Sequence, residues 1–527
     1  MVSVKGWVVM KRDDFAREID IDQELNVDFE SLNGNRDWLE VYALYQENIE
    51  IFSEIIEQTM HRYDMTKIQA RDAVLYELMS ANYERYHRES LHSRNRVKWS
   101  FVYIATFSGL FLSGLLSLFV IQRKLKFNLL FEEMFAKDGW NKRFYRYITQ
   151  ILSNKTISKA ILYTHPGIAK DIFNKSIEQW DGNVINRRYS SLLFGFKESF
   201  LMISKNLFFI HRLFKLSKNL NIIYIYLRII RKHLLYSSQI KNIEADVMVA
   251  AGDYYWNPIK YFVYKKNVKN IILLQHNFKN EYLHNRLFQY CDFYYAHSKQ
   301  AIEKLEGIPF TKKYAIGSFQ LLPYLKDVPI EYDIMFINQT VNDNLTNVYP
   351  DLDQEQLIVS YYILIDNFKQ YMQQHPNLKA IYVAKGETID SEPSITVKKM
   401  FQNIPNVTFE GAYGPKTFEV VKKSALIINM YSSVGFEAYG FDKKVLWINY
   451  NGCCDVFKYD TEEESLHVLK DSTDYNTFAN RVDLLLSPDV TVIDYYKKLK
   501  EKYMNIQENP AKIVADKIYA LLAVSSC

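Results

Sequence analysis

The chain has 527 residues, of which 48% are hydrophobic and 24% charged, so it is too long for one core and too apolar to be disordered. Its 65 basic and 61 acidic side chains give a net charge of only +4, which provides no reason to expect a nucleic-acid partner. The four cysteines show neither CxxC spacing nor a disulfide framework, a pattern typical of a reducing compartment and unlike a structural zinc site.

Residues 1–98 are predicted to form a polar, helical accessory segment. Apolar residues recur at helical spacing in 39–45, 49–56 and 69–86. We interpret this segment as structural and without a chemical role, either a cap packed on the first domain or a self-association surface. Residues 1–10 lack the apolar core of a signal peptide.

Residues 101–121 form an uncharged run of 21 residues that supports two interpretations. As a single helix, the run is long enough to span a bilayer. Divided at Ser108-Gly109, it becomes a strand (99–106) and a helix (110–121), followed by a second strand near 125–130. Parallel strands buried on both faces also read as continuous apolar runs, so we favour this second interpretation.

From 99 to 325 predicted strands and helices alternate, which indicates a parallel, doubly wound α/β domain. The predicted strands are 160–164, 246–251, 270–275, 292–296 and 313–316, with helical stretches at 189–235 and 298–305. Residues 317–329 are predicted to cross between domains.

The second half, 326–527, repeats the pattern and predicts another Rossmann-like domain. Its expected strands are 332–338, 379–384, 407–409, 426–430 and 445–450, its expected helices 357–373, 394–402 and 416–423, and three terminal helices lie near 474–486, 491–504 and 510–522. Two such halves joined by a linker predict a cleft, because open α/β sheets bind ligands at the carboxyl ends of their strands.

The most informative local pattern is residues 426–440, LIINMYSSVGFEAYG, which predicts a buried strand, a turn of small hydroxyl residues and a helix. Free main-chain N–H groups and the positive end of the helix dipole then lie beside Ser432 and Ser433. A phosphate group binds well in such a place. Glu437 follows one turn along the helix, where its carboxylate can accept from ribose hydroxyls or be a solvated or salt-bridged helix residue.

Three segments together carry a family resemblance: 271–276 (IILLQH), 409–413 (FEGAY) and 432–438 (SSVGFEA). The chain resembles bacterial capsule and surface-polysaccharide glycosyltransferases of the GT-B fold over roughly 99–522. The resemblance implies two Rossmann-like domains facing a cleft, the nucleotide donor held by the C-terminal half and the acceptor by the N-terminal half. It also implies ribose binding by Glu437 and no structural need for a metal or other cofactor.

Further candidates for donor binding come after two other strands of the second half. Gly411, Ala412 and Tyr413 can let the nucleotide base lie against the backbone, although a glycine after a strand is often only a turn. Lys385 ends a strand and can neutralise a diphosphate, or can be an ordinary surface lysine.

Two residues of the first half are candidate catalytic bases. His276 ends the strand 270–275, and an imidazole can take a proton near neutral pH. Asp253 follows the strand 246–251 at the same expected edge. A histidine hydrogen-bonded within a loop is the structural alternative for His276.

Other patterns fail on context. The His-Pro pairs at 165–166 and 375–376 are similar to a motif of bacterial sialyltransferases, which follows a strand in the nucleotide domain. His165 lies in the other half of the chain and His375 precedes its strand, so neither pair indicates a sialic-acid donor. Asp351-Leu352-Asp353 stands just before a predicted helix and is better interpreted as its N-cap than as a metal-binding motif. P-loop, zinc-protease and α/β-hydrolase motifs are absent from the sequence.

The sequence thus predicts a glycosyltransferase that moves a sugar from a nucleotide-activated donor to a surface or capsular glycan, free or lipid-linked. The alternatives are a nucleotide-sugar epimerase of the same fold and a non-catalytic, membrane-associated scaffold in glycan assembly. We expect a cytoplasmic protein, with peripheral contact at the inner face of the cell membrane. Donor, acceptor, linkage and stereochemical outcome stay open.

Overall fold

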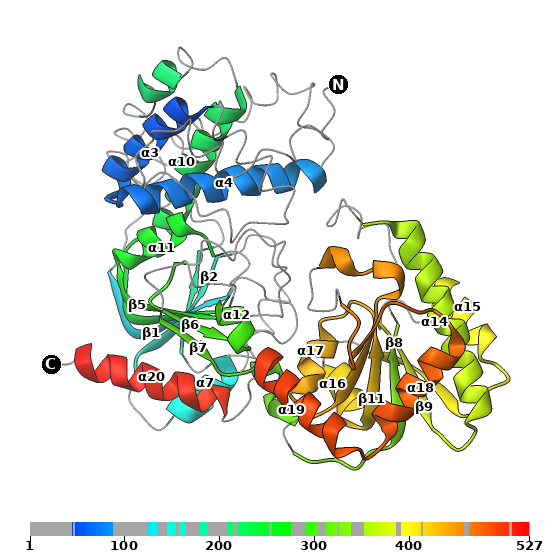
Figure 1. The fold of residues 1–527 in the computed structure, drawn as a ribbon. Coiled ribbons are helices and arrows are strands. Elements are labelled where there is room, and N and C mark those ends of the chain that lie inside the picture. Colours follow the sequence, from blue (N-terminus) through cyan, green and yellow to red (C-terminus); the bar gives the residue numbers. More distant parts are fainter. Residues whose placement is uncertain are drawn as a thin grey trace.

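The computed structural model contains two parallel β-sheets, one in each half of the chain, with helices packed around them (Figure 1). It describes residue 45 and residues 48–87, 124–133, 145–153, 157–164, 180, 182–187, 206, 208–213, 220–251, 256–275, 290–303, 312–324, 326–338, 352–385, 392–412, 415–457, 463–504 and 509–525. The predicted strand and helix of 99–121 lie outside these residues.

The first sheet has seven parallel strands in the order β3-β2-β1-β4-β5-β6-β7. The strands are β1 Leu125–Glu133, β2 Lys159–Tyr163, β3 Asn183–Asn186, β4 Ile243–Ala250, β5 Val268–Leu274, β6 Phe293–Ala296 and β7 Lys312–Ala315. This is the Rossmann order 3-2-1-4-5-6 with one strand added, so the strand order reverses between β1 and β4.

Both faces of this sheet are buried, because alternate residues of each strand enter different hydrophobic clusters. Leu130 and Met248 pack on one side with helices α3 Ile49–Tyr63, α4 Lys67–His87, α10 Leu220–Ile240 and α11 Pro258–Lys265. Leu129 and Val247 pack on the other with α7 Tyr145–Leu152. Because both faces of each strand are buried, nearly every residue of the strand is apolar, and this produces the near-continuous apolar runs by which the strands were predicted.

The N-terminal helices α3 and α4 form a cap on the first sheet's lobe (Figure 1). Glu77 of α4 is fully buried and pairs with two cations of α10: its carboxylate lies 3.1 Å from Arg228 Nε and 2.6 Å from Lys232 Nζ. Asp72 accepts a hydrogen bond from the Tyr290 hydroxyl. These contacts attach α4 to α10 and to Tyr290 of the first lobe.

The second sheet has six parallel strands in the order β10-β9-β8-β11-β12-β13, again the Rossmann order. Its strands are β8 Tyr332–Ile337, β9 Ala380–Lys385, β10 Val407–Ala412, β11 Ser424–Asn429, β12 Lys444–Ile448 and β13 Val468–Leu469. Its helices are α14 Gln354–Gln374, α15 Glu392–Met400, α16 Pro415–Lys422, α17 Val434–Tyr439, α18 Tyr475–Leu486 and α19 Val490–Tyr503. The predicted fold class, α/β with two Rossmann-like sheets and an N-terminal helical extension, is confirmed.

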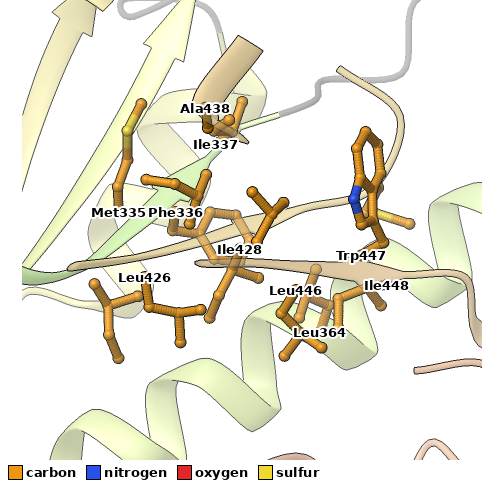
Figure 2. Packing of buried hydrophobic residues seen from close by; sticks show 14 of the residues in the cluster. Met335, Phe336, Ile337, Leu364, Leu426, Ile428, Ala438, Leu446, Trp447 and Ile448 are labelled. Carbon is orange, nitrogen blue, oxygen red and sulfur yellow. The ribbon is translucent and has the colours of Figure 1, made fainter. Parts of the chain in front are cut away.

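The core of the second lobe lies between its central strands and the helices on both sides (Figure 2). Ile428 of β11 and Leu446 of β12 are fully buried, with Leu364 of α14 beside them. Helix α14 begins at an N-cap aspartate, since Asp353 Oδ1 accepts a hydrogen bond from the Gln356 N–H at 2.9 Å. The interpretation of Asp353 as a cap is therefore confirmed.

The last helix, α20 Pro510–Ser525, leaves the second lobe and packs against β4 and α7 of the first (Figure 1). Val514 and Ile518 are fully buried in the same cluster as Val247. The lobes also meet where α19 touches α12 Lys299–Glu303. The proposed domain boundaries at 98 and 325 stay predictions.

Within the described residues no helix has the length and hydropathy to cross a bilayer. The candidate run 101–121 was not among them, so its two interpretations both stand.

Candidate functional site

The turn that follows β11 lies at the carboxyl edge of the second sheet, where the strand order reverses between β8 and β11. Ligands of Rossmann-like sheets bind outside this edge. The Asn429 side chain holds the turn: its Nδ2 donates to the Ser432 carbonyl at 2.8 Å and its Oδ1 accepts from the Ser432 N–H at 3.0 Å. Asn429 is almost fully buried, so the turn has a fixed base.

The two serines of this turn are both partly exposed but differ in their contacts. Ser432 Oγ lies 3.4 Å from the Val434 N–H, a long hydrogen bond. Ser433 occupies the N-cap position of α17 with helical backbone angles, and its side chain makes no capping hydrogen bond. The interpretation of Ser433 as a side-chain cap is therefore not supported.

Gly435 is required where the turn enters α17. A Cβ atom there would lie 2.4 Å from Asn429 Nδ2 and 2.7 Å from Trp447 Cζ2. Because no real Cβ approaches other atoms so closely, the spacing between the serines and α17 depends on this glycine.

Glu437 lies in the first turn of α17 and is only 3% exposed. Its burial excludes the solvated alternative, while the salt-bridged alternative stays open. A buried carboxylate usually has a specific hydrogen-bonding or charged partner, because removing an ionised group from water costs a large desolvation free energy.

The structure corrects one local prediction and leaves other candidates untested. Gly411 and Ala412 lie inside β10, paired in register with Ala384 and Lys385, and not in a turn after the strand. Lys385 ends β9 as predicted. Tyr413 lies outside the described residues.

Asn338 is a polar residue of this edge that sequence reasoning missed. It follows β8 directly, so it stands across the reversal point from the turn after β11. Its Oδ1 accepts from the Tyr361 hydroxyl at 2.6 Å and its Nδ2 donates to Ser394 Oγ at 3.2 Å. The sequence did contain a signal for this residue: Asn338 comes directly after the apolar run of β8, and residues that follow a buried parallel strand lie at the carboxyl edge of the sheet.

The candidate bases Asp253 and His276 lie outside the described residues, but the strands before them are placed. Strand β4 ends at Ala250 and strand β5 at Leu274, both at the carboxyl edge of the first sheet. Next to this edge, the Gln275 Oε1 accepts from the His297 N–H at 2.8 Å, and the His297 Nε2 lies 3.1 Å from the Gln275 carbonyl. These bonds join the ends of β5 and β6, immediately before residue 276.

A buried ion pair, also missed, lies at the same edge. Glu132 near the end of β1 is fully buried and its Oε1 lies 2.6 Å from the Nζ of Lys260, which is 1% exposed. Thr164 Oγ1 donates to this carboxylate oxygen at 3.1 Å. The ammonium lies over the Trp256 ring at 4.8 Å from its centroid. Burial lowers the pKa of Lys260, and the Glu132 charge opposes that shift.

At the opposite, amino edge of the second sheet, Lys443 has a perturbed pKa. Burial and the neighbouring Lys422 charge lower the pKa of Lys443 to about 8. The Lys422 Nζ is itself buried without a hydrogen-bond acceptor among the described residues.

Replacing Lys443 by methionine is expected to raise the free energy of unfolding by about 1 kcal/mol at pH 7, a value reduced for partial solvent access. The folded protein binds the Lys443 proton more weakly than the unfolded chain does, so the charged lysine destabilises the fold. Wild-type stability therefore rises as the pH increases from about 8, the folded pKa, towards 10.5, the unfolded pKa. The gain should disappear at pH 10.5 in urea unfolding. Lys444→Met is the control with opposite sign, because Lys444 Nζ donates to two carbonyls, of Leu485 and Ser487. A gain that does not change with pH would contradict the prediction.

No group of three or more His, Cys, Asp or Glu side chains suited to hold a metal ion occurs in the described part of the chain.

Comparison with known proteins gives likeness of fold only. No family model matches the chain, and no curated protein sequence matches it. Similar solved structures include the UDP-GlcNAc 2-epimerase of Methanocaldococcus jannaschii, at 10% identity and TM-score 0.43 over 75% of this chain and 100% of that one.

Two other solved structures show a comparable likeness. A glycosyltransferase of Rickettsia africae shows 12% identity and TM-score 0.40, covering 75% of this chain and 99% of that one. The wall teichoic acid polymerase TagF shows 12% identity and TM-score 0.43, covering 82% and 99%. At such low identity the likeness concerns the fold alone, and the two strand orders establish the Rossmann-like sheets without it.

Proposed function

We propose that the chain is a glycosyltransferase that moves a sugar from a nucleotide-activated donor to a surface or capsular glycan. The observation that carries the proposal is the turn after β11. Ser433 has a hydroxyl without a capping bond, at the point of the sheet where Rossmann-like domains bind nucleotides.

In this proposal the donor diphosphate binds at Ser432 and Ser433. Helix α17 has only six residues, so its dipole is small, and the contribution comes from hydroxyls and the first main-chain N–H groups. Lys385 at the end of β9 adds positive charge. Glu437 accepts from the ribose hydroxyls, and its burial is what favours binding over solvation. Gly411, Ala412 and Tyr413 border the base.

The proposed reaction needs a base and a stabilised leaving group. The acceptor hydroxyl loses its proton to His276 or Asp253 while its oxygen forms a bond to the anomeric carbon of the sugar. The bond from that carbon to the diphosphate breaks, and the diphosphate leaves with the electron pair. Hydrogen bonds from Ser432 and Ser433 stabilise the charge that develops there.

Ser433→Ala is expected to weaken donor binding about 10- to 150-fold, since one hydrogen bond to a charged group contributes about 1.5–3 kcal/mol. The measurement is saturation-transfer NMR or calorimetry across UDP-, GDP-, CMP- and CDP-linked sugars. Ser487→Ala is the matched control: Ser487 caps α18 in the same lobe, and its hydroxyl donates to the Leu484 carbonyl.

Three results would decide against the proposal or redirect it. If none of the donors binds the wild type, the nucleotide site is wrong. If a donor binds equally well to Ser433→Ala, the turn after β11 does not hold the phosphate. If a UDP-sugar is converted to its epimer with no acceptor present, the reaction is epimerisation and not transfer.

A further inference from the structure

Two consecutive cysteines lie at the carboxyl end of β12 with their sulfur atoms in contact. The Sγ atoms of Cys453 and Cys454 are 3.6 Å apart, and both thiols are free. Cys454 is fully buried and Cys453 is 4% exposed. Neighbouring side chains of an extended chain point to opposite faces, but Cys453 has helical backbone angles, φ −59° and ψ −19°, which let the two side chains lie together.

A tight turn provides that backbone. Asn451 and Gly452 both adopt left-handed conformations, with φ of 54° and 74°. The Asn449 side chain then holds the next residues, since its Oδ1 accepts from the Cys454 N–H at 2.6 Å and its Nδ2 donates to Asp455 Oδ1 at 2.7 Å. The sulfur contact is thus built into the turn.

The environment makes the two thiols unequal. A hydrogen bond from Cys454 lowers the pKa of Cys453, with a contribution from Ser360 on α14. Burial raises the pKa of Cys454. Cys453 is also the only one of the two with any exposed surface, so it is the thiol that a small disulfide meets first, and its thiolate is the form that attacks.

We propose that Cys453 and Cys454 form a thiol–disulfide site that a small-molecule disulfide oxidises to a bond between the two adjacent residues. The Cys453 thiolate attacks the small disulfide and expels one thiolate. Cys454 then loses its proton and attacks the Cys453 sulfur, which forms the protein disulfide and expels the second small thiolate. Two protein thiols are oxidised and one small disulfide is reduced to two thiols.

Formation of this bond must move the turn, because the sulfurs approach from 3.6 Å to about 2.05 Å. Tyr431, whose pKa is raised by burial and by the nearby cysteines, lies next to the pair and stacks on Phe457 at 4.8 Å between ring centroids. Tyr431 directly precedes Ser432. Oxidation is therefore expected to weaken donor binding, a consequence that rests on the proposed function.

The test uses the folded chain, reduced, desalted and then treated with glutathione disulfide. After acid quenching, unfolding and alkylation, mass spectrometry should find the peptide with residues 453 and 454 short of two hydrogens and unalkylated. Cys291, a single buried thiol in the first lobe, should be alkylated in the same sample. Oxidation of dithiothreitol by the same solution shows that the reagent is active.

Two variants separate the site from general thiol reactivity. Cys454→Ser should stop at the mixed disulfide on Cys453, while Cys291→Ser should form the adjacent disulfide as the wild type does. Alkylation of both Cys453 and Cys454 in treated wild type, or only a mixed disulfide there, would overturn the proposal. If the disulfide forms but no nucleotide sugar binds in either redox state, the proposed function fails and this site stands.

Discussion

Lys260→Met is expected to lower the free energy of unfolding by about 3–5 kcal/mol, the usual cost of leaving a buried charge without its partner. Glu132 is fully buried, and its Oε1 receives the Lys260 ammonium at 2.6 Å. Its other oxygen, Oε2, has no hydrogen-bond partner among the described residues, and the side chain is 0% exposed. Urea unfolding followed by circular dichroism measures the difference.

The control variants distinguish this pair from an ordinary ion pair. Lys269→Met removes a cation 2.8 Å from Asp246 Oδ1, but Lys269 is 57% exposed, so the expected loss is below about 1 kcal/mol. The double change Lys260→Met with Glu132→Leu removes both charges and should recover most of the loss. A single Lys260→Met variant as stable as Lys269→Met would show that the pair is unimportant.

Gly435→Ala is expected to cost about 1–3 kcal/mol of stability, as overpacking of a filled site does. The new methyl carbon would lie 2.4 Å from Asn429 Nδ2, the atom that donates to the Ser432 carbonyl. Displacement of Asn429 releases the serine turn, so donor binding should fall together with the melting temperature. Thermal unfolding and donor titration on one preparation measure both effects.

A double-mutant cycle tests the cause. Asn429→Ala removes the clashing amide together with its two bonds to Ser432. If Gly435→Ala acts through Asn429, the double variant should lose clearly less stability than the sum of the single changes. Strict additivity would place the damage at Trp447, the other near neighbour.

The parts of the fold that the sequence predicted well are those where local pattern and tertiary burial agree. The unit β11, α17 and β12 was recognisable because a run of apolar residues ends at small hydroxyl residues and a new helix. The short edge strands β3 and β13 were missed, since four and two residues carry too little pattern. Strand β10 was predicted too short, because Gly411 suggested a turn and pairing with β9 overrides that preference.

The residues of the candidate site also differ in how far the sequence alone could indicate them. Ser432, Ser433 and Glu437 could be proposed from the sequence because the pattern that marks them lies among neighbours in the chain, and their donor-binding roles stay predictions. Glu132 and Lys260 could not, because the burial of a charged residue in a strand or a helix shows only when its distant partner is known. Asn338 was overlooked although its position after β8 marked it, since the segment that follows gave no motif.

The crossing of α20 to the first lobe has a consequence for how the protein is made. Val514 and Ile518 complete a hydrophobic cluster whose other members come mainly from residues 129–322. During synthesis from the N-terminus, the earlier lobe must wait with that surface uncovered until the ribosome has released α20. The second lobe can finish its core beforehand, so we expect it to reach its native state first on the nascent polypeptide.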